Sequence, residues 1–190
     1  MVRHGVHDLV GRTLCGRAAG VGLNADGLRQ AEALARNLHR PDRVLTSPVE
    51  RCRQTAIPIA TAHDLPLEEE GALIEIDFGD WAGRDFDALR TLPEWHRWNS
   101  DRDQARPPNG EAMLEVQLRL SLWLERLSRE DQGTVVAISH ADAIKSVVAL
   151  TLGLSLRSHD RFEVSPGSVT TVKAAPDALT LVQLNAVPHD

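Results

Sequence analysis

Apolar residues follow two different spacings along the chain, one typical of buried strands and the other typical of helices. Runs rich in Val, Leu and Ile at residues 43–47 and 134–139 predict two buried strands, and residues 168–173 and 179–184 predict two closing strands joined by a Pro-Asp turn at 176–177. Between these runs, apolar residues recur every three or four positions over residues 24–38 and 110–128, which predicts amphipathic helices. Strands that alternate with helices favour an α/β layered fold.

Several of the expected elements have recognisable ends. Asn24 is the expected N-cap of the first helix, and Ser47 is the expected cap of a second helix that runs to about residue 63, with Pro48 near its first position. A further helix is expected from about residue 142. Only Met1 and Val2 precede the first motif described below, so we expect a very short first strand or one that starts upstream. The apolar side of the first helix is expected to consist of Leu28, Ala31, Leu34, Ala35 and Leu38.

Residues 71–110 interrupt this alternation. They contain Trp81, Trp95 and Trp98 together with several prolines, and we expect one short helix at about residues 86–90. We interpret the segment as an excursion from the main sheet that covers the site, within a single domain formed by residues 1–190. The helix that follows it is expected to bury Met113, Val116, Leu118, Leu120, Leu122, Trp123 and Leu127.

Composition narrows the classes of partner. The chain has 190 residues, of which 42% are hydrophobic and 25% are charged, as in an ordinary globular domain that is large enough to bury a core. Its formal net charge is −6, which argues against nucleic acid as a partner, because binding a polyanion usually requires a basic face. A few buried arginines can still form a local positive pocket for a small phosphorylated substrate.

Cysteine usage and hydropathy indicate a cytoplasmic protein. Cys15 and Cys52 are not spaced as a CxxC or metal-binding motif, and we expect both to stay reduced. The N-terminus has no apolar run typical of a signal peptide, and no stretch of about 18 apolar residues predicts a membrane-spanning helix. We therefore expect no membrane as a partner, and the sequence assigns no oligomeric state.

Arginine and histidine recur where strands are expected to end and helices to begin. Arg3 and His4 follow the first apolar residues. Arg51 lies in the first turn of the second helix, and His140 follows the strand at 134–139. In an open α/β sheet, ligands bind at the carboxyl ends of the strands, where helix N-termini supply N–H donors for an anion. The sequence therefore predicts a phosphate site that contains two arginines and two histidines.

These residue types suit phosphoryl transfer. Arginine binds phosphate oxygens through a planar fork and stays charged, and one neutral histidine could attack phosphorus to form a phosphohistidine. An acid is then needed to protonate the leaving alcohol. Glu75 lies among apolar residues, where desolvation would raise its pKa and keep a proton available. Asp77 and Asp80 are the competing carboxylates.

Four motifs stand in order along nearly the whole chain. They are Arg3-His4-Gly5, Ser47-Pro48-x-x-Arg51-Cys52-x-Gln54-Thr55-Ala56, Leu73-x-Glu75 with Phe78-Gly79-x-Trp81-x-Gly83, and Val136-Ala137-Ile138-Ser139-His140. Weaker matches are Leu23-Asn24-x-x-Gly27-x-x-Gln30-Ala31 and Asn109-Gly110-Glu111-Ala112. Together these motifs resemble those of the histidine phosphatase superfamily, in its phosphoglycerate mutase-like branch.

The resemblance implies a three-layer α/β/α fold with a mostly parallel central sheet and one antiparallel strand. It implies that His4 is the phospho-accepting nucleophile and that Glu75 is the proton donor. The phosphate pocket would be formed by Arg3, Arg51 and His140. The family uses no metal, and we expect no cofactor here.

Five positions depart from the usual pattern of the family. None of them removes a catalytic group, so they bear on which substrate is bound rather than on the class of reaction. His7 stands where Thr or Ser is common, Val10 replaces an Asn of the mutases, and Ala141 replaces the Gly after the second histidine. Ala82 and Ala112 replace a Glu and a Ser. We expect His7 and Ala141 to lie at the substrate, and a purely structural role is the alternative for His7.

Most other polar and aromatic residues are expected to lie at the surface or to serve packing. Arg12, Arg17 and Arg53 are expected to be surface charges, with Arg12 and Arg17 at the mouth of the pocket as the alternative. The tryptophans of the excursion are expected to serve packing, and the alternative is that one of them lines the substrate entrance. The remaining histidines are expected to be solvated or locally capped, namely His39, His63, His96, His159 and His189.

The sequence therefore predicts metal-independent hydrolysis of a phosphomonoester on a small metabolite, through a phosphohistidine. Among enzymes, the alternative is a phosphoglycerate mutase, which the short chain and Val10 disfavour. The other alternative is a non-catalytic phospho-ligand binding protein, and the complete set of candidate side chains argues against it. Sugar phosphates, phosphoglycerates, nucleotide derivatives and cobalamin precursors all stay open as substrates.

Overall fold

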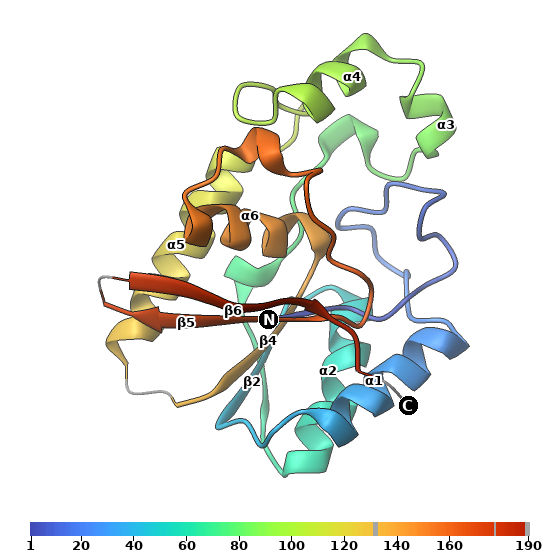
Figure 1. Ribbon diagram of the computed structural model, residues 1–190. Helices are drawn as coiled ribbons and strands as arrows, with labels where there is room; N and C mark the ends of the chain where they lie inside the picture. Colours follow the sequence, from blue (N-terminus) through green and yellow to red (C-terminus); the bar gives the residue numbers. More distant parts are fainter. Residues whose placement is uncertain (131–132, 177, 189–190) are drawn as a thin grey trace.

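A sheet of six strands, in the order β3-β2-β4-β1-β5-β6, forms the centre of residues 1–130, 133–176 and 178–188, which the computed structural model describes (Figure 1). The strands are β1 (Val2–Arg3), β2 (Arg43–Thr46), β3 (Leu67–Glu69), β4 (Val135–Ser139), β5 (Val169–Ala175) and β6 (Ala178–Ala186). The first four pair in parallel, whereas β5 is antiparallel to both β1 and β6. The predicted sheet, mostly parallel with one antiparallel strand, is confirmed.

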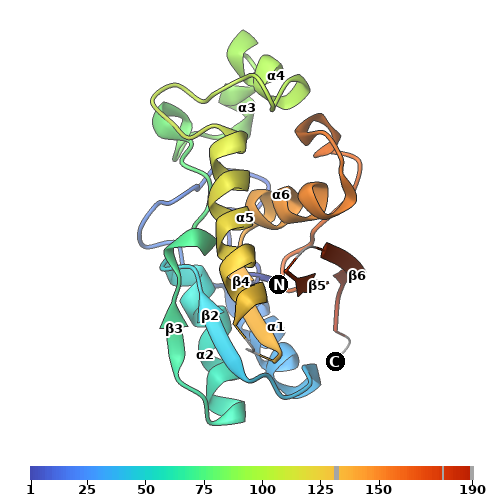
Figure 2. The ribbon, with the colours of Figure 1, turned by 90° about the vertical axis from the view of Figure 1, so that its left-hand side faces the viewer.

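Helices cover both faces of the sheet (Figures 1 and 2). α1 (Ala25–Asn37) and α2 (Glu50–His63) contact each other on one face. α5 (Met113–Arg129) and α6 (Ala141–Leu152) contact each other on the opposite face. The predicted three-layer α/β/α architecture is therefore confirmed.

Alternation within the central strands divides their apolar side chains between two cores. Val44 of β2, with Val136 and Ile138 of β4, lies in the core that includes residues of α1 and α2. Leu45 and Ala137, the residues between them, lie in the core that includes residues of α5 and α6. Because successive side chains of a strand point to opposite faces, a strand that is apolar at every position is buried on both sides.

The segment between β3 and α5 leaves the sheet and forms a group of short helices at one end of the molecule (Figure 1). η1 (Gly71–Leu73) still contacts β4 and α5, whereas η2 (Gly79–Trp81), α3 (Phe86–Leu89) and α4 (Pro93–Ser100) form the group at that end, and η3 (Leu156–Ser158) follows α6. Trp81 and Trp98 are buried, and the rings of Trp81 and Trp95 meet edge to face with centroids 5.4 Å apart. The predicted packing role of the tryptophans is confirmed.

Helix starts agree with the sequence at α1 and differ at α2. The side chain of Asn24 accepts a hydrogen bond from the N–H of Gly27 at 3.0 Å, so this residue is the N-cap of α1 as predicted. α2 begins at Glu50, and its N-cap is Val49, which makes no side-chain capping bond. The predicted cap, Ser47, has a different partner, described below.

Some exposed leucines contradict the predicted core. The sequence pattern assigns Leu28 of α1 and Leu118 and Leu122 of α5 to buried faces, but their exposed fractions are 48%, 59% and 56%. Leucine occurs on several sides of α5, so spacing alone does not identify the face that meets the sheet. Leu124, which the prediction omits, is buried instead.

The short elements β3 and α4 have no counterpart among the predictions. β3 is only three residues long, and α4 buries only Trp98, so neither produces a periodic apolar pattern. Two predicted features, the Asp177 of the closing turn and the solvated His189, lie outside the described residues.

Candidate active site

Strand register places the two predicted histidines side by side at the carboxyl end of the sheet. β1 pairs with β4 so that Arg3 lies opposite Ser139, and both strands end there. His4 and His140 are therefore the next residues on neighbouring strands. Their buried imidazole rings meet edge to face with centroids 5.3 Å apart.

The loop after β1 fixes the orientation of the His4 ring. Gly5 packs so closely on α1 that a Cβ atom there would lie 2.7 Å from the carbonyl oxygen of Gly27, and its N–H donates to Thr55 Oγ1 at 3.0 Å. The Nδ1 atom of His4 lies 2.8 Å from the carbonyl oxygen of Gly5. Because a carbonyl only accepts, Nδ1 carries the proton and Nε2 carries the free electron pair.

Arg51 links the two histidines from the first turn of α2, where it is buried. Its Nε donates to His4 Nε2 at 3.1 Å. Its Nη2 donates to the carbonyl of Gly16 at 2.7 Å and to His140 Nδ1 at 3.0 Å. One planar guanidinium thus holds both imidazoles through separate nitrogens, which a lysine could not do.

Ser47 orients the second histidine. Because Nδ1 of His140 accepts from Arg51, its Nε2 carries the proton and donates to Ser47 Oγ at 2.8 Å. The bond that the same Oγ atom accepts from the N–H of Val49 is longer, at 3.4 Å. The prediction that Ser47 caps α2 is therefore wrong, because its hydroxyl serves a buried imidazole rather than the helix end.

Ser47→Ala is expected to lower the free energy of unfolding by about 1–3 kcal/mol, because it leaves the buried Nε2–H of His140 without its oxygen acceptor. Urea unfolding followed by circular dichroism measures this change. Ser121→Ala, which removes an exposed hydroxyl bonded to Leu118 in α5, is the matched control and should change stability by less than about 0.5 kcal/mol. Equal effects of the two substitutions would contradict the assigned role of Ser47.

Three buried nitrogens near the histidines have no hydrogen-bond partner among the described residues. They are Arg3 Nε, Arg51 Nη1 and His7 Nδ1. Arg3 is held by a bond of 2.7 Å from Nη1 to the carbonyl of Val164, and the His7 ring centroid lies 5.4 Å from that of His4. A buried donor without a partner is costly, so the two guanidinium nitrogens suit the oxygens of a bound anion.

Burial keeps the histidines of the site neutral. Desolvation is the largest cause, and Arg51 adds to it, so the pKa values of His4 and His140 lie well below the usual value. His7 is less enclosed, and desolvation with Arg51 and Arg3 lowers its pKa to about 4. A neutral imidazole keeps a free electron pair, which a nucleophile requires.

Glu75 is the carboxyl group that the structure brings to the histidines. It is buried, its Oε1 accepts from the N–H of Ile76 at 3.0 Å, and its Oε2 lies 4.0 Å from His140 Nδ1. Desolvation is the largest cause, and the charge of Asp142 adds to it, so the pKa of Glu75 is raised to about 7 although Arg51 opposes the shift. The group can therefore hold a proton near neutral pH.

The competing carboxylates have other partners. Asp77 accepts from the N–H of Gly79 at 2.9 Å, and its side chain is 47% exposed. Asp80 is exposed and accepts from Asn109 at 3.0 Å. Only Glu75 among the three combines burial with proximity to a histidine.

The first turn of α6 adds backbone donors and an unpredicted carboxylate to the site. Ala141 begins this helix directly after His140, where N–H groups have no acceptor within the helix. Asp142 accepts from Arg102 at 3.1 Å and bonds to His159. Burial alone would raise the pKa of Asp142, but Arg102 and His159 outweigh it and hold the pKa well below its usual value.

Two sequence interpretations are corrected by these contacts. His159 is not solvated, since it is only 5% exposed and is paired with Asp142. Arg17 is not an ordinary surface charge, because its Nε donates to the carbonyl of Glu75 at 2.7 Å. Arg12 and Arg53 are exposed as predicted. No spacing rule could find these pairs, because their members lie far apart in the chain.

The described residues form neither a metal cluster nor a membrane-spanning helix. Among the side chains that the structure describes, no group of three or more His, Cys, Asp or Glu residues is arranged to hold a metal ion. Within the same residues, no helix combines the length and the apolar character needed to span a membrane.

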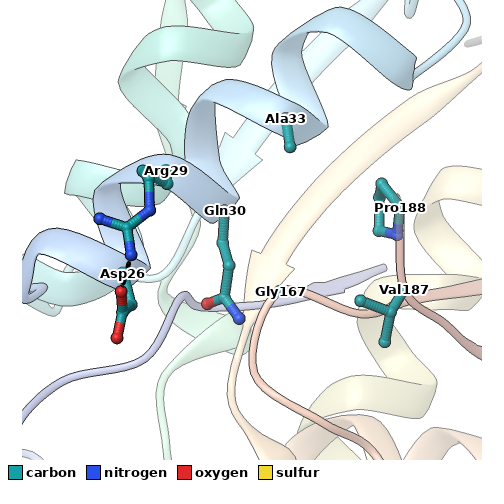
Figure 3. Close-up of a pocket in the computed structure, with 7 residues that line it drawn as sticks. All are labelled: Asp26, Arg29, Gln30, Ala33, Gly167, Val187 and Pro188. Carbon is teal, nitrogen blue, oxygen red and sulfur yellow. Dashed lines mark hydrogen bonds and ion pairs between the residues drawn. The ribbon is translucent and has the colours of Figure 1, made fainter. Parts of the chain in front are cut away.

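A separate pocket of about 320 Å³ lies between α1 and the segment that follows β6 (Figure 3). Its lining residues are Asp26, Arg29, Gln30, Ala33, Gly167, Val187 and Pro188. Arg29 pairs with Asp26, and Gln30 accepts from the N–H of Val6 at 2.9 Å. The polar side chains of this pocket are thus already engaged, and none of the predicted site residues lines it.

Comparison with known proteins gives one family and several similar phosphatases. The family model of the histidine phosphatase superfamily (branch 1) matches residues 1–187. Phosphoserine phosphatase 1 of Hydrogenobacter thermophilus is 29% identical over 172 residues, which cover 88% of this chain and 82% of that protein. The adenosylcobalamin/alpha-ribazole phosphatase of Salmonella typhimurium is 30% identical over 191 residues, which cover 98% of this chain and 95% of that protein.

A solved structure has the same fold. The mycobacterial glucosyl-3-phosphoglycerate phosphatase matches with a TM-score of 0.83 at 24% sequence identity, and the match covers 98% of this chain and 97% of that one.

Proposed function

Because this chain belongs to the histidine phosphatase superfamily (branch 1), we propose that its site hydrolyses phosphomonoesters through a phosphohistidine on His4. The chain is a phosphatase that acts on small phosphorylated metabolites. The proposal adds the roles of individual residues to that reaction.

One observation carries the assignment of the nucleophile. His4 is neutral and buried, its Nδ1–H is tied to the carbonyl of Gly5, and its Nε2 points to Arg51. The free electron pair thus faces the guanidinium that would hold a phosphate. Such pre-set orientation supplies much of the catalysis in phosphoryl transfer, which depends on positioning and electrostatic support.

The first step transfers the phosphoryl group to the enzyme. Phosphate binding draws Arg51 Nε away from His4 Nε2 and onto a phosphate oxygen. The Nε2 of His4 then attacks phosphorus, the bond from phosphorus to the leaving oxygen breaks, and the proton of Glu75 passes to that oxygen. Arg3 and Arg51 stabilise the charge on the other phosphate oxygens. A bound phosphate dianion also favours a proton on Nδ1 of His140. This nitrogen then gives up its bond from Arg51 Nη2, and the imidazole becomes a further donor to the phosphate.

The second step releases phosphate. A water molecule attacks phosphorus, the bond from phosphorus to His4 Nε2 breaks, and the water proton passes to the carboxylate of Glu75. The nucleophile and the acid are then restored. We assign the N–H of Ala141 and the ring of His7 to contacts with the substrate, as the sequence predicts.

The reaction class is tested by phosphate release from a panel of metabolites in the presence of EDTA. Phosphoserine, alpha-ribazole 5′-phosphate and glucosyl-3-phosphoglycerate represent the activities named for similar proteins, and the panel extends to 3-phosphoglycerate, sugar phosphates and nucleotides. We expect release from at least one substrate without added metal. Isomerisation of 3-phosphoglycerate in the presence of its bisphosphate primer, without phosphate release, would instead identify a mutase.

The pH dependence of the rate tests the role of Glu75. Since its pKa is raised to about 7 and its protonated form is the acid, kcat/KM on an alkyl phosphate should fall about tenfold per pH unit above pH 7. The ratio of alkyl to 4-nitrophenyl phosphate hydrolysis isolates this effect, because nitrophenolate leaves without a proton. Glu75→Gln should make that ratio low and independent of pH. A ratio that keeps its decline in the variant would exclude Glu75 as the acid.

We further propose that residues 1–190 act as a single domain in which the segment at about 71–110 covers the site. Buried Leu89 and Trp98 of this segment belong to the same apolar core as Leu45 and Ala137 of the sheet. Free Cys15 and Cys52 support a cytoplasmic location. The net charge of −6 supports a small substrate rather than nucleic acid or an anionic membrane surface as the partner.

A further inference from the structure

We propose that Glu111 is a positioning residue for the general acid, and that it acts by clamping the chain segment that carries Glu75. The inference rests on the proposed function of Glu75. Glu111 itself does not touch the reacting groups, because its carboxylate is occupied by Arg17 and Arg119.

Glu75 needs such support because its own backbone is irregular. It lies between η1 and η2, in a segment that forms neither helix nor strand. Its carboxyl group has one short bond, to the neighbouring N–H of Ile76. The position of the acid relative to His140 is therefore decided by where the surrounding backbone is held.

The carboxylate of Glu111 lies between two guanidinium groups. Its Oε2 accepts from Arg17 Nη2 at 2.8 Å, and its Oε1 accepts from Arg119 Nε at 3.0 Å. The Glu111 side chain is only 16% exposed, and that of Arg119 only 20%. Charge-assisted bonds in such a shielded setting are stronger and more directional than an exposed ion pair.

Each of these arginines also holds a carbonyl of the acid's segment. Arg17 Nε donates to the carbonyl of Glu75 at 2.7 Å, and Arg119 Nη1 donates to the carbonyl of Ala72. Glu111 therefore orients two guanidiniums that bind the segment at its start and at the acid itself.

Glu111 also binds the segment directly, on the far side of the acid. Its backbone N–H donates to the carbonyl of Asp77 at 2.8 Å, and its Oε2 accepts from the N–H of Asp77 at 3.3 Å. The preceding Gly110 permits this contact, since a Cβ atom there would lie 2.5 Å from the carbonyl oxygen of Asp77. The clamp thus has contacts before, at and after Glu75.

The experiment compares Glu111→Gln with wild type on two probes, β-glycerol phosphate and 4-nitrophenyl phosphate. The parameter is kcat/KM, which covers only the steps through departure of the first leaving group. A displaced acid should lower kcat/KM about 10- to 100-fold for β-glycerol phosphate, whose leaving alkoxide needs a proton. The loss for 4-nitrophenyl phosphate should stay within about threefold, because that step needs no acid.

Two further measurements separate positioning from general loss of structure. The inhibition constant of inorganic phosphate should stay within about twofold of wild type, because the clamp does not touch the arginines of the phosphate pocket. In a Glu75→Gln background, Glu111→Gln should cause no further loss on β-glycerol phosphate, because both changes act on the same proton transfer.

Glu115→Gln is the matched control. Glu115 lies in the first turn of α5, its side chain is 49% exposed, and it accepts from Arg106 at 2.7 Å and from the N–H of Ala112 at 2.8 Å rather than from the segment that carries Glu75. We expect it to leave both probes within about twofold of wild type.

The outcomes distinguish this inference from the proposed function. Equal losses on the two probes, a weakened phosphate pocket or an additive loss in the Glu75→Gln background would each overturn the positioning role of Glu111. If Glu75→Gln itself fails to discriminate between the probes, the role of Glu75 is wrong and the inference falls with it. If Glu75→Gln loses kcat/KM selectively on β-glycerol phosphate but Glu111→Gln does not, the positioning role of Glu111 is wrong while the proposed role of Glu75 stands.

Discussion

His4→Ala is expected to reduce phosphate release by at least about 10⁴-fold, because it removes the atom that forms the covalent intermediate. The ring is buried and its two nitrogens are held by Gly5 and Arg51, so the imidazole is fixed in one orientation that the alanine variant does not reproduce. The measurement is steady-state hydrolysis of 4-nitrophenyl phosphate, on which no acid is required.

Trapping of the intermediate identifies the residue directly. Rapid quenching of wild-type enzyme with labelled substrate should give a phosphoprotein that is stable in alkali and labile in acid, as a phosphoramidate is, and His4→Ala should give none. His7→Ala should still become labelled, although its ring lies 5.4 Å from that of His4. The exposed His39 provides a control substitution for general effects of losing a histidine. If His4→Ala becomes labelled, or if His7→Ala alone fails to become labelled, the nucleophile is a residue other than His4.

Arg51→Lys is expected to lower kcat/KM by about 10²- to 10³-fold while the positive charge is retained. The guanidinium donates to His4, Gly16 and His140 at once, and its Nη1 has no partner in the described part of the chain. An ammonium group has no fixed fork, so it cannot orient both imidazoles in the free enzyme and then bind phosphate oxygens through two nitrogens. The inhibition constant of inorganic phosphate should rise along with the fall in rate.

Arg53→Lys is the control for this substitution, two residues further along α2. Arg53 is exposed and pairs with Glu69 at 3.1 Å, so its replacement should change kcat/KM by less than about twofold. If Arg51→Lys behaves like Arg53→Lys, charge alone is sufficient and the forked geometry has no catalytic role.

Most candidate site residues could be named from the sequence because each is tied to a local boundary. His4 and His140 each follow a strand, and Arg51 lies at the start of a helix. In a parallel sheet these boundaries meet at one edge, so their approach follows from the strand pattern. Their assigned roles stay predictions, which the experiments above test.

Residues whose function depends on distant partners could not be recognised in the same way. Ser47 reads locally as a helix cap, yet its hydroxyl meets His140, which is 93 positions away. Arg17 reads as a surface charge, yet it binds Glu75 and Glu111. Local patterns predict the backbone conformation within a few residues, but they do not predict which distant side chains come into contact in the fold.

The apolar faces of the amphipathic helices also could be predicted only in part from local spacing. Ala31 and Leu34 are buried as their spacing indicates, but Leu28 and Leu118 face solvent. Periodicity shows that a helix has an apolar side, whereas the packing of that helix on the sheet selects which residues form it.

The amino-acid pattern was thus sufficient for the layered α/β architecture, for the mostly parallel sheet and for the family, because strand burial, helix spacing and motif order are properties of the chain itself. The three-dimensional arrangement was required for the tautomers of His4 and His140, for the raised pKa of Glu75 and for the clamp at Glu111. Each of these depends on burial or on a hydrogen bond between segments far apart in sequence, and such interactions exist only once the chain has folded.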